Sequence, residues 1–311
     1  MFSESGIQET LDSTSTKLNA IKLNENPTSK IVLDRNPLDE ESKKVAENEL
    51  RETPERVIES VNELRKILKV DKSLQYDDSE EFLIMMLRPV KFYPESAYGL
   101  MKRIADFRKA NAEILKNVSP ETDKDSFLNS KVVNVLVDRD QKRRRILVMN
   151  LGSNWNPKEL NIDKLFRILY LIHFGALMEP LTQVHGSIII MDFTDLSRTQ
   201  AFAFTPAFSK RLLTFIQEVV PLRIKAVHIV FQPFVFKIVW NLFKPFIGAK
   251  LKSRIFFHGA KLASLHEHID PNYLPEEYGG TRGKIDYSGA DWYPVLAELE
   301  NTIKDIQKVH N

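Results

Sequence analysis

The chain has 311 residues, of which 43% are hydrophobic and 28% are charged, and its formal net charge is +2. This length and composition predict a folded protein with one large and one smaller domain. Because the sequence contains no cysteine, it excludes disulfide scaffolds, thiolate metal sites and cysteine nucleophiles. The small net charge provides no global field for nucleic acid, so any electrostatic targeting has to be local.

Residues 1–41 are rich in Ser, Thr, Asn, Asp and Lys, and this composition predicts a flexible N-terminal tail. The first residues lack a basic segment followed by an apolar core, so we expect no secretory signal. No stretch reaches the ~18 uninterrupted apolar residues of a transmembrane helix. The expected location is therefore cytoplasmic.

Residues 42–120 have helical periodicity and predict a small three-helix domain. Thr53 is a suitable N-cap for the first helix, and Pro54 occupies its first position. The second helix ends at Pro89 and the third begins at Pro94. Apolar residues of the first helix recur at helical spacing, at Val57, Val61, Leu64, Ile67 and Leu68.

After residue 120 the pattern changes, and short β-branched runs alternate with helical segments. The runs are VVNVLV, RRILVMNL, GSIIIMDF, KAVHIVF and SRIFFHG. Strands that are apolar almost throughout are buried on both faces, so residues 121–281 predict an α/β domain with a mostly parallel sheet. Residues 282–311 follow a glycine turn and predict a C-terminal helical extension.

The segment 223–254 joins an apolar helix to regularly placed cations. Prolines at 233 and 245 bound the helix, and Lys237, Asn241 and Lys244 form one narrow polar stripe on it. Its other residues are Phe234, Val235, Phe236, Ile238, Val239, Trp240, Leu242 and Phe243. Such a helix is either a buried core helix or one that alternates between a protein cavity and a membrane.

Cations border this helix on both sides. Arg223 and Lys225 lie two residues apart at the start of a predicted strand and therefore share a face. Lys250 and Arg254 follow the helix. Such cations suit anionic lipid head groups, to which each contributes about 1 kcal/mol, and an inserted Phe or Trp adds roughly 1.5 to 3 kcal/mol. The alternative is an ordinary solvated rim of charges.

Catalytic motifs are missing from the sequence, which has no GxSxG, GxxxxGKS/T, GxGxxG or HExxH. The glycine-rich GGTRG at 279–283 predicts a plain turn. His266 and His268 are poorly spaced for metal ligation and predict surface positions. The charged run DRDQKRRR at 138–145 predicts a solvated turn. Because no nucleophile stands beside a base, we expect neither an enzyme nor a metal site.

Several motifs, in order and spacing, resemble the CRAL-TRIO family of hydrophobic-ligand carriers, near its tocopherol-carrier and clavesin branches. The resemblance covers residues 42–281, and its motifs are FLIMMLRPVKFYPESAYGLMK, NWNPKEL, DKLFRILYLI, GSIIIMDFTDLS, VPLRIKAVHIV, QPFVFKIVWNLFKPFIGAKLKSRIFFHG and LPEEYGG. It implies an N-terminal helical domain and a lipid-binding domain whose apolar pocket is closed by a mobile gate helix.

The resemblance also implies three sets of site residues. The implied ligand pocket contains Phe166, Leu169, His173, Met191, Phe202, Phe204, Leu212, Phe215, Ile216, Ile224 and Val227. The implied gate helix contains Phe234, Val235, Ile238, Val239, Trp240, Leu242 and Phe243. The implied phosphoinositide-binding residues form what we term the basic cluster: Arg223, Lys225, Lys250 and Arg254.

The chain departs from the family pattern at a few positions. Leu169 and His173 stand where a tocopherol carrier has two serines, which argues against transferring vitamin E as the ligand. His173 either meets a hydroxyl or carbonyl group of another ligand or is a satisfied core histidine. Val90 replaces an arginine of the lipid-head site, although Arg88 and Lys91 lie beside it, and Phe231 replaces an asparagine before the gate.

We therefore expect a non-enzymatic intracellular carrier that binds one small hydrophobic ligand, such as a tocopherol, a retinoid or a similar lipid. It would exchange this ligand at phosphoinositide-containing membranes, with transient association with endosomal or other anionic membranes. We expect no cofactor; a hydrophobic lipid is expected as the bound ligand, and nucleic acid is not an expected partner. The alternatives are a phosphoinositide-sensing membrane adaptor with a structural lipid and, third, a lipid-modifying enzyme.

Overall fold

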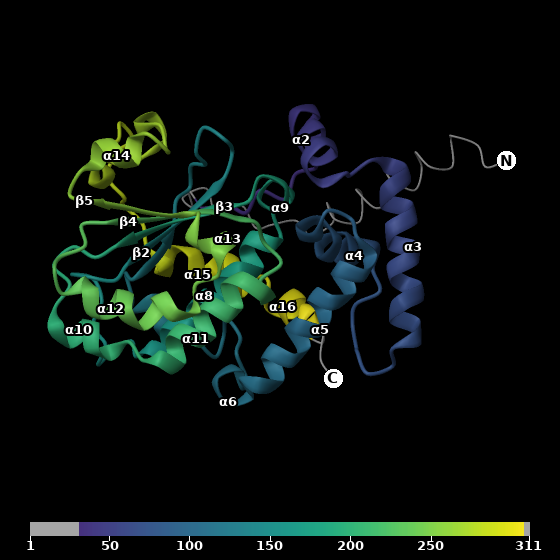
Figure 1. Cartoon of the computed structure of the whole chain (residues 1–311), viewed down its shortest axis with the longest axis horizontal. Coiled ribbons are helices and arrows are strands. Elements are labelled where there is room, and N and C mark those ends of the chain that lie inside the picture. Colours follow the sequence, from purple (N-terminus) through teal and green to yellow (C-terminus); the bar gives the residue numbers. More distant parts are fainter. Residues whose placement is uncertain (1–30, 308–311) are drawn as a thin grey trace. The chain divides into compact units, whose positions relative to one another are not determined.

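The computed structural model of the chain describes residues 31–307, so residues 1–30 of the expected tail and residues 308–311 lie outside it. The described part contains a five-stranded sheet with helices on both of its faces (Figure 1). In spatial order its strands are β1 Val133–Val135, β2 Arg145–Asn150, β3 Ser187–Asp192, β4 Ile224–Val230 and β5 Ile255–Gly259. Only β1 is antiparallel to its neighbour, which confirms the expected α/β class with a mostly parallel sheet.

Alternating side chains of the central strands enter two separate apolar layers, as the period of a strand requires. In β3, Ile188 and Ile190 belong to a layer that also contains Leu265 and Tyr278. Ile189 belongs to the larger layer on the other side of the sheet. We call the first side the closed face and the second the cavity face. Both are buried, as the almost wholly apolar strands predict.

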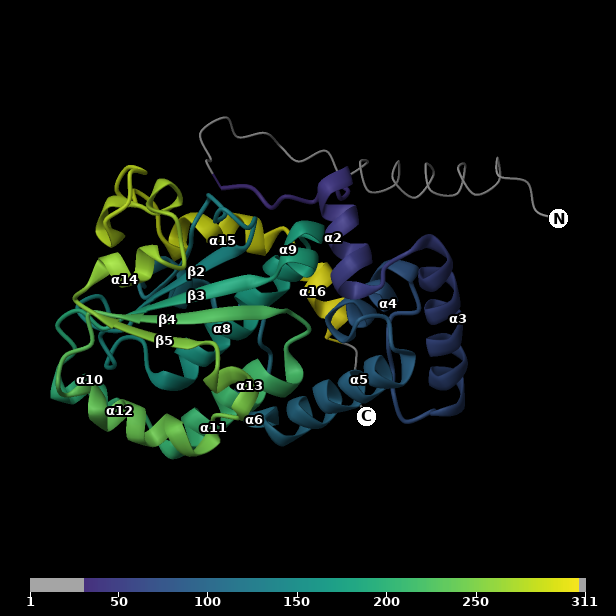
Figure 2. The same cartoon turned by 45° about the horizontal axis from the view of Figure 1, so that its top comes forward.

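Helices from the connections between strands cover the cavity face. Figure 2 shows α10, α11 and α12 along one side of the strands and α14 on the other side. Local sequence explains where several of them begin: Thr205 caps α11 by accepting from the N–H of Phe208, and Asn161 caps α8 in the same manner. The bounds are α8 Ile162–Leu177, α9 Pro180–His185, α10 Arg198–Ala203, α11 Pro206–Thr214, α12 Phe236–Phe243, α13 Ala249–Lys252 and α14 Leu262–His266.

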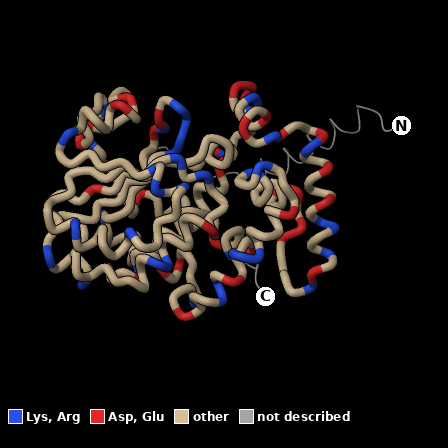
Figure 3. The backbone as a smooth tube through the Cα atoms, in the orientation of Figure 1, with Lys and Arg blue, Asp and Glu red and all other residues tan. Residues whose placement is uncertain are grey.

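The N-terminal part contains the three predicted helices and some additional ones. Thr53 caps α3 as expected and Pro54 is its first residue, while Ser79 caps α4. A further helix, α2, begins after Asp39, whose side chain accepts from the N–H of Ser42. Figure 3 shows charges of both signs along α3 and mostly uncharged strands in the sheet. The bounds are α2 Glu40–Leu50, α3 Pro54–Val70, α4 Glu80–Leu87, α5 Pro94–Ala110, α6 Ala112–Leu115 and α7 Lys124–Leu128.

The C-terminal extension forms two helices, α15 Gly289–Ala297 and α16 Glu300–Ile306, where the sequence predicts one. Its Trp292 is buried and donates from Nε1 to the carbonyl of Val135 at 2.9 Å, which ties the extension to the edge strand. Shorter turns complete the path: 3-10 helices at Arg88–Val90, Lys244–Phe246, Pro271–Tyr273 and Glu276–Tyr278, and a π-helical turn at Phe215–Val219.

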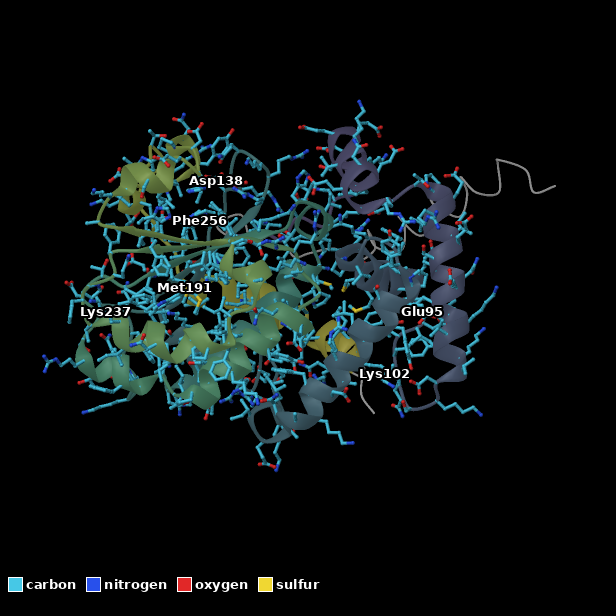
Figure 4. All side chains as sticks on the ribbon, in the orientation of Figure 1. Glu95, Lys102, Asp138, Met191, Lys237 and Phe256 are labelled. Carbon is cyan, nitrogen blue, oxygen red and sulfur yellow. The ribbon has the colours of Figure 1, made fainter. Side chains whose placement is uncertain are left out.

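The charged run at 138–145 is not the solvated turn that we expected. Asp138 lies at its outer part (Figure 4), but Arg145 is buried and its guanidinium binds the buried carboxylate of Glu179, with Nε at 3.0 Å from Oε2. Arg139 reaches the same carboxylate at 3.0 Å. A buried negative charge requires such partners. The run therefore holds Glu179, an interaction that its own composition does not reveal.

His266 and His268 are half-buried, which contradicts the expected surface positions. His266 donates from Nε2 to the carbonyl of Tyr278 at 2.9 Å. The ring of His268 lies 4.2 Å from that of Phe256 and 5.2 Å from that of the buried His228. The two histidines are covered because the segment after β5 folds back over the closed face, on the side where Figure 4 places Phe256.

Candidate functional site

A cavity lies between the sheet and helices α8, α11 and α12. Its volume is about 170 Å³. Met191, inside the α/β part of Figure 4, is one of its wall residues. The walls are almost wholly aliphatic and aromatic; the sheet supplies Val135, Leu147, Met149, Ile189, Met191, Ile224, Val227, Ile229 and Ile255. Such a lining suits an apolar ligand.

The register of the sheet explains why these wall residues stand together. Leu147 is paired with Ile189 and Met149 with Met191, so each pair projects from the same side of β2 and β3. The intervening Val148 and Ile190 belong to the closed face. The cavity face thus follows directly from the alternation of two adjacent strands.

The predicted gate helix covers this cavity as α12. Phe236, Val239, Trp240 and Phe243, at spacings i, i+3, i+4 and i+7, line the cavity with one face. The polar stripe of Lys237, Asn241 and Lys244 is exposed, and Figure 4 shows Lys237 at the outer edge of the molecule. Of the other predicted gate residues, Val235, Ile238 and Leu242 are half-buried, and Phe234 precedes the helix and is 81% exposed.

Aromatic packing holds α12 in place. The rings of Phe236 and Phe193 are 4.6 Å apart, and those of Trp240 and Phe257 are 4.9 Å apart. Phe243 lies edge-on to Phe204 at 5.9 Å. Among residues 31–307, no hydrogen bond joins a side chain of α12 to another helix or strand. Apolar contacts are non-directional, so the helix can leave this position without breaking a specific bond of its own side chains.

The two ends of the gate are defined by the backbone and by one amide side chain. Phe231, the residue after β4, has φ +53°, in the left-handed region that asparagine enters more readily than phenylalanine. At the other end, Gln217 donates to the carbonyl of Phe246 at 3.0 Å and accepts from the N–H of Gly248 at 2.8 Å.

The structure brings most of the predicted pocket residues to this cavity. Those that line it are Leu169, His173, Met191, Phe204, Leu212, Phe215, Ile216, Ile224 and Val227. Phe166 does not line it; it is fully buried between α5 and α8, with its ring 6.1 Å from that of Phe107. Phe202 is 69% exposed because α10 turns Gln200 inward, where its amide binds the carbonyls of Gly152 and Trp155.

Other wall residues come from segments that the sequence did not associate with a pocket. They are Leu33, Arg145, Glu179, Ser187, Trp292 and Leu296. Leu33 belongs to the expected tail, yet it is only 9% exposed, and Ile31 is buried as well. Alternation along β2 and β3 could have indicated Arg145 and Ser187. The contributions of Leu33 and Trp292 depend on contacts between distant segments, for which no local signal exists.

His173 is a neutral polar group in the wall. Burial lowers its pKa to about 3, although its hydrogen bond with the carbonyl of Tyr170 acts in the opposite direction. Since that carbonyl can only accept, Nδ1 carries the proton and donates, and Nε2 is left as an acceptor. The ring packs against Phe174 at 4.0 Å and Phe215 at 5.2 Å. His173 is therefore partly satisfied by its own helix.

Glu179 and Ser187 give one end of the cavity a polar character. Burial raises the pKa of Glu179, but Arg145, with Arg139 and Thr182, more than offsets this effect, so its pKa is lowered and the group is a carboxylate. It also accepts from the hydroxyl of Thr182 at 2.7 Å and from the N–H of Asp34 at 3.1 Å. The Ser187 hydroxyl makes no hydrogen bond to another residue of 31–307. Like Nε2 of His173, the hydroxyl of Ser187 is thus a polar wall group that is open to a ligand.

The basic cluster is only partly assembled. Arg223 and Lys225 converge on Glu49 of α2, and Arg254 donates to the carbonyl of Ile224 between them. Lys250 is exposed on α13. Near Val90, the guanidinium of Arg88 is 2.6 Å from Glu52, and it donates to Gln183 at 2.6 Å. Arg88 is thus committed to an internal ion pair and does not replace the missing arginine.

Within the part of the chain that the structure describes, no helix combines the length and the apolar character needed to cross a membrane. The same part contains no group of three or more His, Asp or Glu side chains that could hold a metal ion.

Residues 129–280 match the model of the CRAL/TRIO domain. The chain is 35% identical over 264 residues to an alpha-tocopherol transfer protein-like protein of Mus musculus, which is 84% of this chain and 75% of that protein. The Homo sapiens protein of that name is 33% identical over 82% of this chain and 74% of its own length. Clavesin-1 of Rattus norvegicus is 29% identical over 76% of this chain and 68% of its own length. The crystal structure of Sfh5 aligns with a TM-score of 0.46 and 17% identity, over 87% of this chain and 100% of that one.

Proposed function

We propose that this chain, which belongs to the CRAL/TRIO family, is a non-enzymatic carrier that encloses one small hydrophobic molecule and exchanges it at phosphoinositide-containing membranes. The observation that carries the proposal is the apolar cavity between the sheet and α12. Tocopherols, retinoids and similar lipids have the chemistry that these walls accept. The carrier would work in the cytoplasm and associate transiently with endosomal or other anionic membranes.

The few polar wall groups favour a ligand that bears one small polar group. The interior of a bilayer and the cavity walls are both apolar, so transfer between them changes the free energy of different apolar molecules by similar small amounts. The apolar walls alone therefore discriminate little between lipids. A polar partner for the ligand adds discrimination, because a site built around such a bond rejects a ligand that lacks it. Ser187 can donate or accept, and His173 retains an acceptor at Nε2. Both therefore suit a ligand hydroxyl.

Exchange at the membrane would use the gate helix. Swinging α12 outward exposes Phe236, Trp240 and Phe243, each of which gains roughly 1.5 to 3 kcal/mol from burial in lipid instead of water. The exposed Phe234 already provides a first apolar contact. A membrane favours the open position only if it binds that position better than the closed one. The apolar face of α12 supplies this difference in affinity.

The basic cluster would choose the membrane by binding phosphoinositide head groups. Each cation near the surface contributes about 1 kcal/mol, so we expect Arg223→Ala with Lys225→Ala to weaken binding to phosphatidylinositol bisphosphate vesicles by about ten-fold or more. Co-sedimentation measures this loss, while the content of bound ligand stays unchanged. Replacing the exposed Lys66 and Lys69 of α3 by alanine gives a control with the same change in charge. Unchanged vesicle binding of the first variant would remove the basic cluster from the mechanism.

The carrier proposal itself is tested by mass spectrometry of molecules extracted from the gently purified protein, together with native mass spectrometry for stoichiometry. We expect one equivalent of a hydrophobic molecule that bears a hydroxyl group. A vesicle-to-vesicle transfer assay should then show catalysed movement of that molecule. A protein that holds its lipid and transfers none would be a membrane adaptor with a structural lipid. An empty protein that takes up no offered lipid would also contradict the carrier proposal.

A further inference from the structure

A carboxylate already occupies two cations of the basic cluster. Glu49, near the end of α2, lies 2.5 Å from Nη2 of Arg223 and 3.1 Å from Nζ of Lys225. Arg223 uses Nη1 as well, donating to the carbonyl of Val184 at 2.6 Å. Its guanidinium is therefore held by two partners and presents a defined edge to Glu49.

The position of Lys225 follows from an irregularity in β4. Ser187 is paired with Ile224 and the next residue, Ile188, with Ala226, so Lys225 is an extra residue without a partner in β3. Such a β-bulge changes the direction in which the side chain of the extra residue points. Here Lys225 and Arg223, which lies just outside the strand, both reach the same carboxylate on α2.

Charge favours this contact at neutral pH. Partial burial raises the pKa of Glu49, but the hydrogen bonds from Arg223 and Lys225 outweigh that effect and leave the pKa lowered, so Glu49 is ionised. Burial lowers the pKa of Lys225, with a further contribution from Arg223, and Glu49 offsets this only in part. The carboxylate thus neutralises one of two closely spaced positive charges.

Other contacts hold α2 in place independently of Glu49. Ser42 and His185 share a hydrogen bond of 2.9 Å between Oγ and Nε2, and Asp39 forms an ion pair with Arg143. Ala46 and Leu50 pack against Val184. These contacts hold both the N-terminal and the C-terminal part of α2. The carboxylate of Glu49 therefore stays near the two cations, at a high effective concentration.

We infer that Glu49 is an internal competitor of the anionic head group, which must displace this carboxylate before it can bind Arg223 and Lys225 together. The inference rests on the head-group role proposed above for these two cations. A phosphate monoester carries about −1.5 to −2 charges and three acceptor oxygens, so it can replace a single carboxylate on both cations. While Glu49 occupies Arg223 and Lys225, the two cations are not available to a head group. The apparent affinity is therefore lowered by the same factor for every head group that needs both cations. Only membranes rich in strongly binding head groups would then recruit the protein.

Replacement of Glu49 by glutamine tests the inference, because glutamine keeps the size of the side chain and removes its charge. Glu49→Gln should bind vesicles of phosphatidylcholine with phosphatidylinositol bisphosphate about five-fold more tightly, the gain from one freed cation. Glu47→Gln is the matched control: it makes the same charge change on an exposed position of α2, where the structure describes no ion pair of its side chain within residues 31–307. It should give no comparable gain.

The decisive comparison repeats Glu49→Gln in the Arg223→Ala, Lys225→Ala background, where the gain should disappear. A gain that persists there, or one that Glu47→Gln matches, would overturn the inference. If the double alanine variant binds weakly but Glu49→Gln binds like the unmodified protein, the inference fails and the proposed function stands. If the double alanine variant binds normally, the head-group role itself fails.

Glu49→Asp, which keeps the charge but shortens the side chain, should give an intermediate gain and is available should the glutamine variant fold poorly.

Discussion

The two faces of the central sheet are built from the same strands and yet serve different ends. Ile188 and Ile190 of β3 are fully buried in the closed face, where Leu265 and Tyr278 pack over them. Their neighbour Ile189 lines the cavity. A face that is to receive a ligand cannot be filled by the chain itself, so its residues forgo part of their packing energy. The closed face must therefore supply more of the stability of the sheet.

The segments that cover the two faces also differ in how they are held in place. The segment over the closed face is held by hydrogen bonds: Gln141 donates to the carbonyl of His268 at 3.1 Å and accepts from the N–H of Asp270 at 3.2 Å. The hydroxyl of Tyr278 lies 3.3 Å from the carboxylate of Asp192. The gate helix over the cavity face is held mainly by aromatic contacts. Directional bonds suit a permanent cover and apolar contacts suit a movable one.

Adjacent residues of β3 provide the largest expected difference between the faces. Ile190→Ala should lower the free energy of unfolding of the ligand-free protein by about 3 kcal/mol, because it opens a cavity in a filled layer. Ile189→Ala should cost less than half of that, because its side chain already borders an empty space. Urea denaturation measures both values. Equal losses would show that the two faces are packed alike in the absence of ligand.

Acid should reveal a second difference, through His228 on the closed face and His173 on the cavity face. Burial, with the neighbouring His258 and His268, lowers the pKa of His228 from 6.5 to about 3. The unfolded chain therefore takes up a proton first as the pH falls, and stability decreases from about pH 6.5 downward. At pH 5 the loss amounts to about 2 kcal/mol for His228. His228→Phe, whose ring would stack on Phe256, should make denaturation curves less dependent on pH by this amount.

The histidine of the cavity face separates pH dependence from ligand binding. Burial lowers the pKa of His173 to about 3 as well, so His173→Phe should also flatten the pH dependence of stability. We expect only His173→Phe to change the content of bound ligand, because only His173 lines the cavity. Parallel pH profiles for both variants and the unmodified protein would contradict the assigned protonation states. Loss of ligand from His228→Phe would contradict the separation of the two faces.

Local features of the sequence predict much of this arrangement. Thr53, Pro54 and the apolar runs of the strands act over a few residues, and the helices and strands that they predict are present. The polar stripe of α12 likewise indicates which of its faces meets water. The sequence is less informative where the partner is distant: nothing near Arg145 indicates the buried Glu179, and nothing near Arg223 indicates Glu49.

The predictions of a solvated turn at 138–145 and of a surface position for His268 are wrong for a related reason. A charged or imidazole side chain is normally solvated, and local composition cannot show that another segment folds over it. Leu33 is the corresponding example among apolar residues, since it belongs to a polar tail and still lines the cavity. In each instance the tertiary fold, and not the local pattern, decides burial.

The smallest expected effect comes from two glutamines, each of which lies on a neighbouring segment and binds backbone groups beside one of the two covers. Gln217 binds Phe246 and Gly248 at the end of the gate, and Gln141 binds His268 and Asp270 on the closed face. Gln217→Leu removes about 1 kcal/mol of hydrogen bonding from the closed gate and should speed release of bound ligand to vesicles about five-fold in a stopped-flow assay. Gln141→Leu should lower the free energy of unfolding by a similar amount without changing the release rate. If both variants release ligand at the same rate, α12 does not limit exchange, because loosening its attachment would then matter no more than loosening the opposite face.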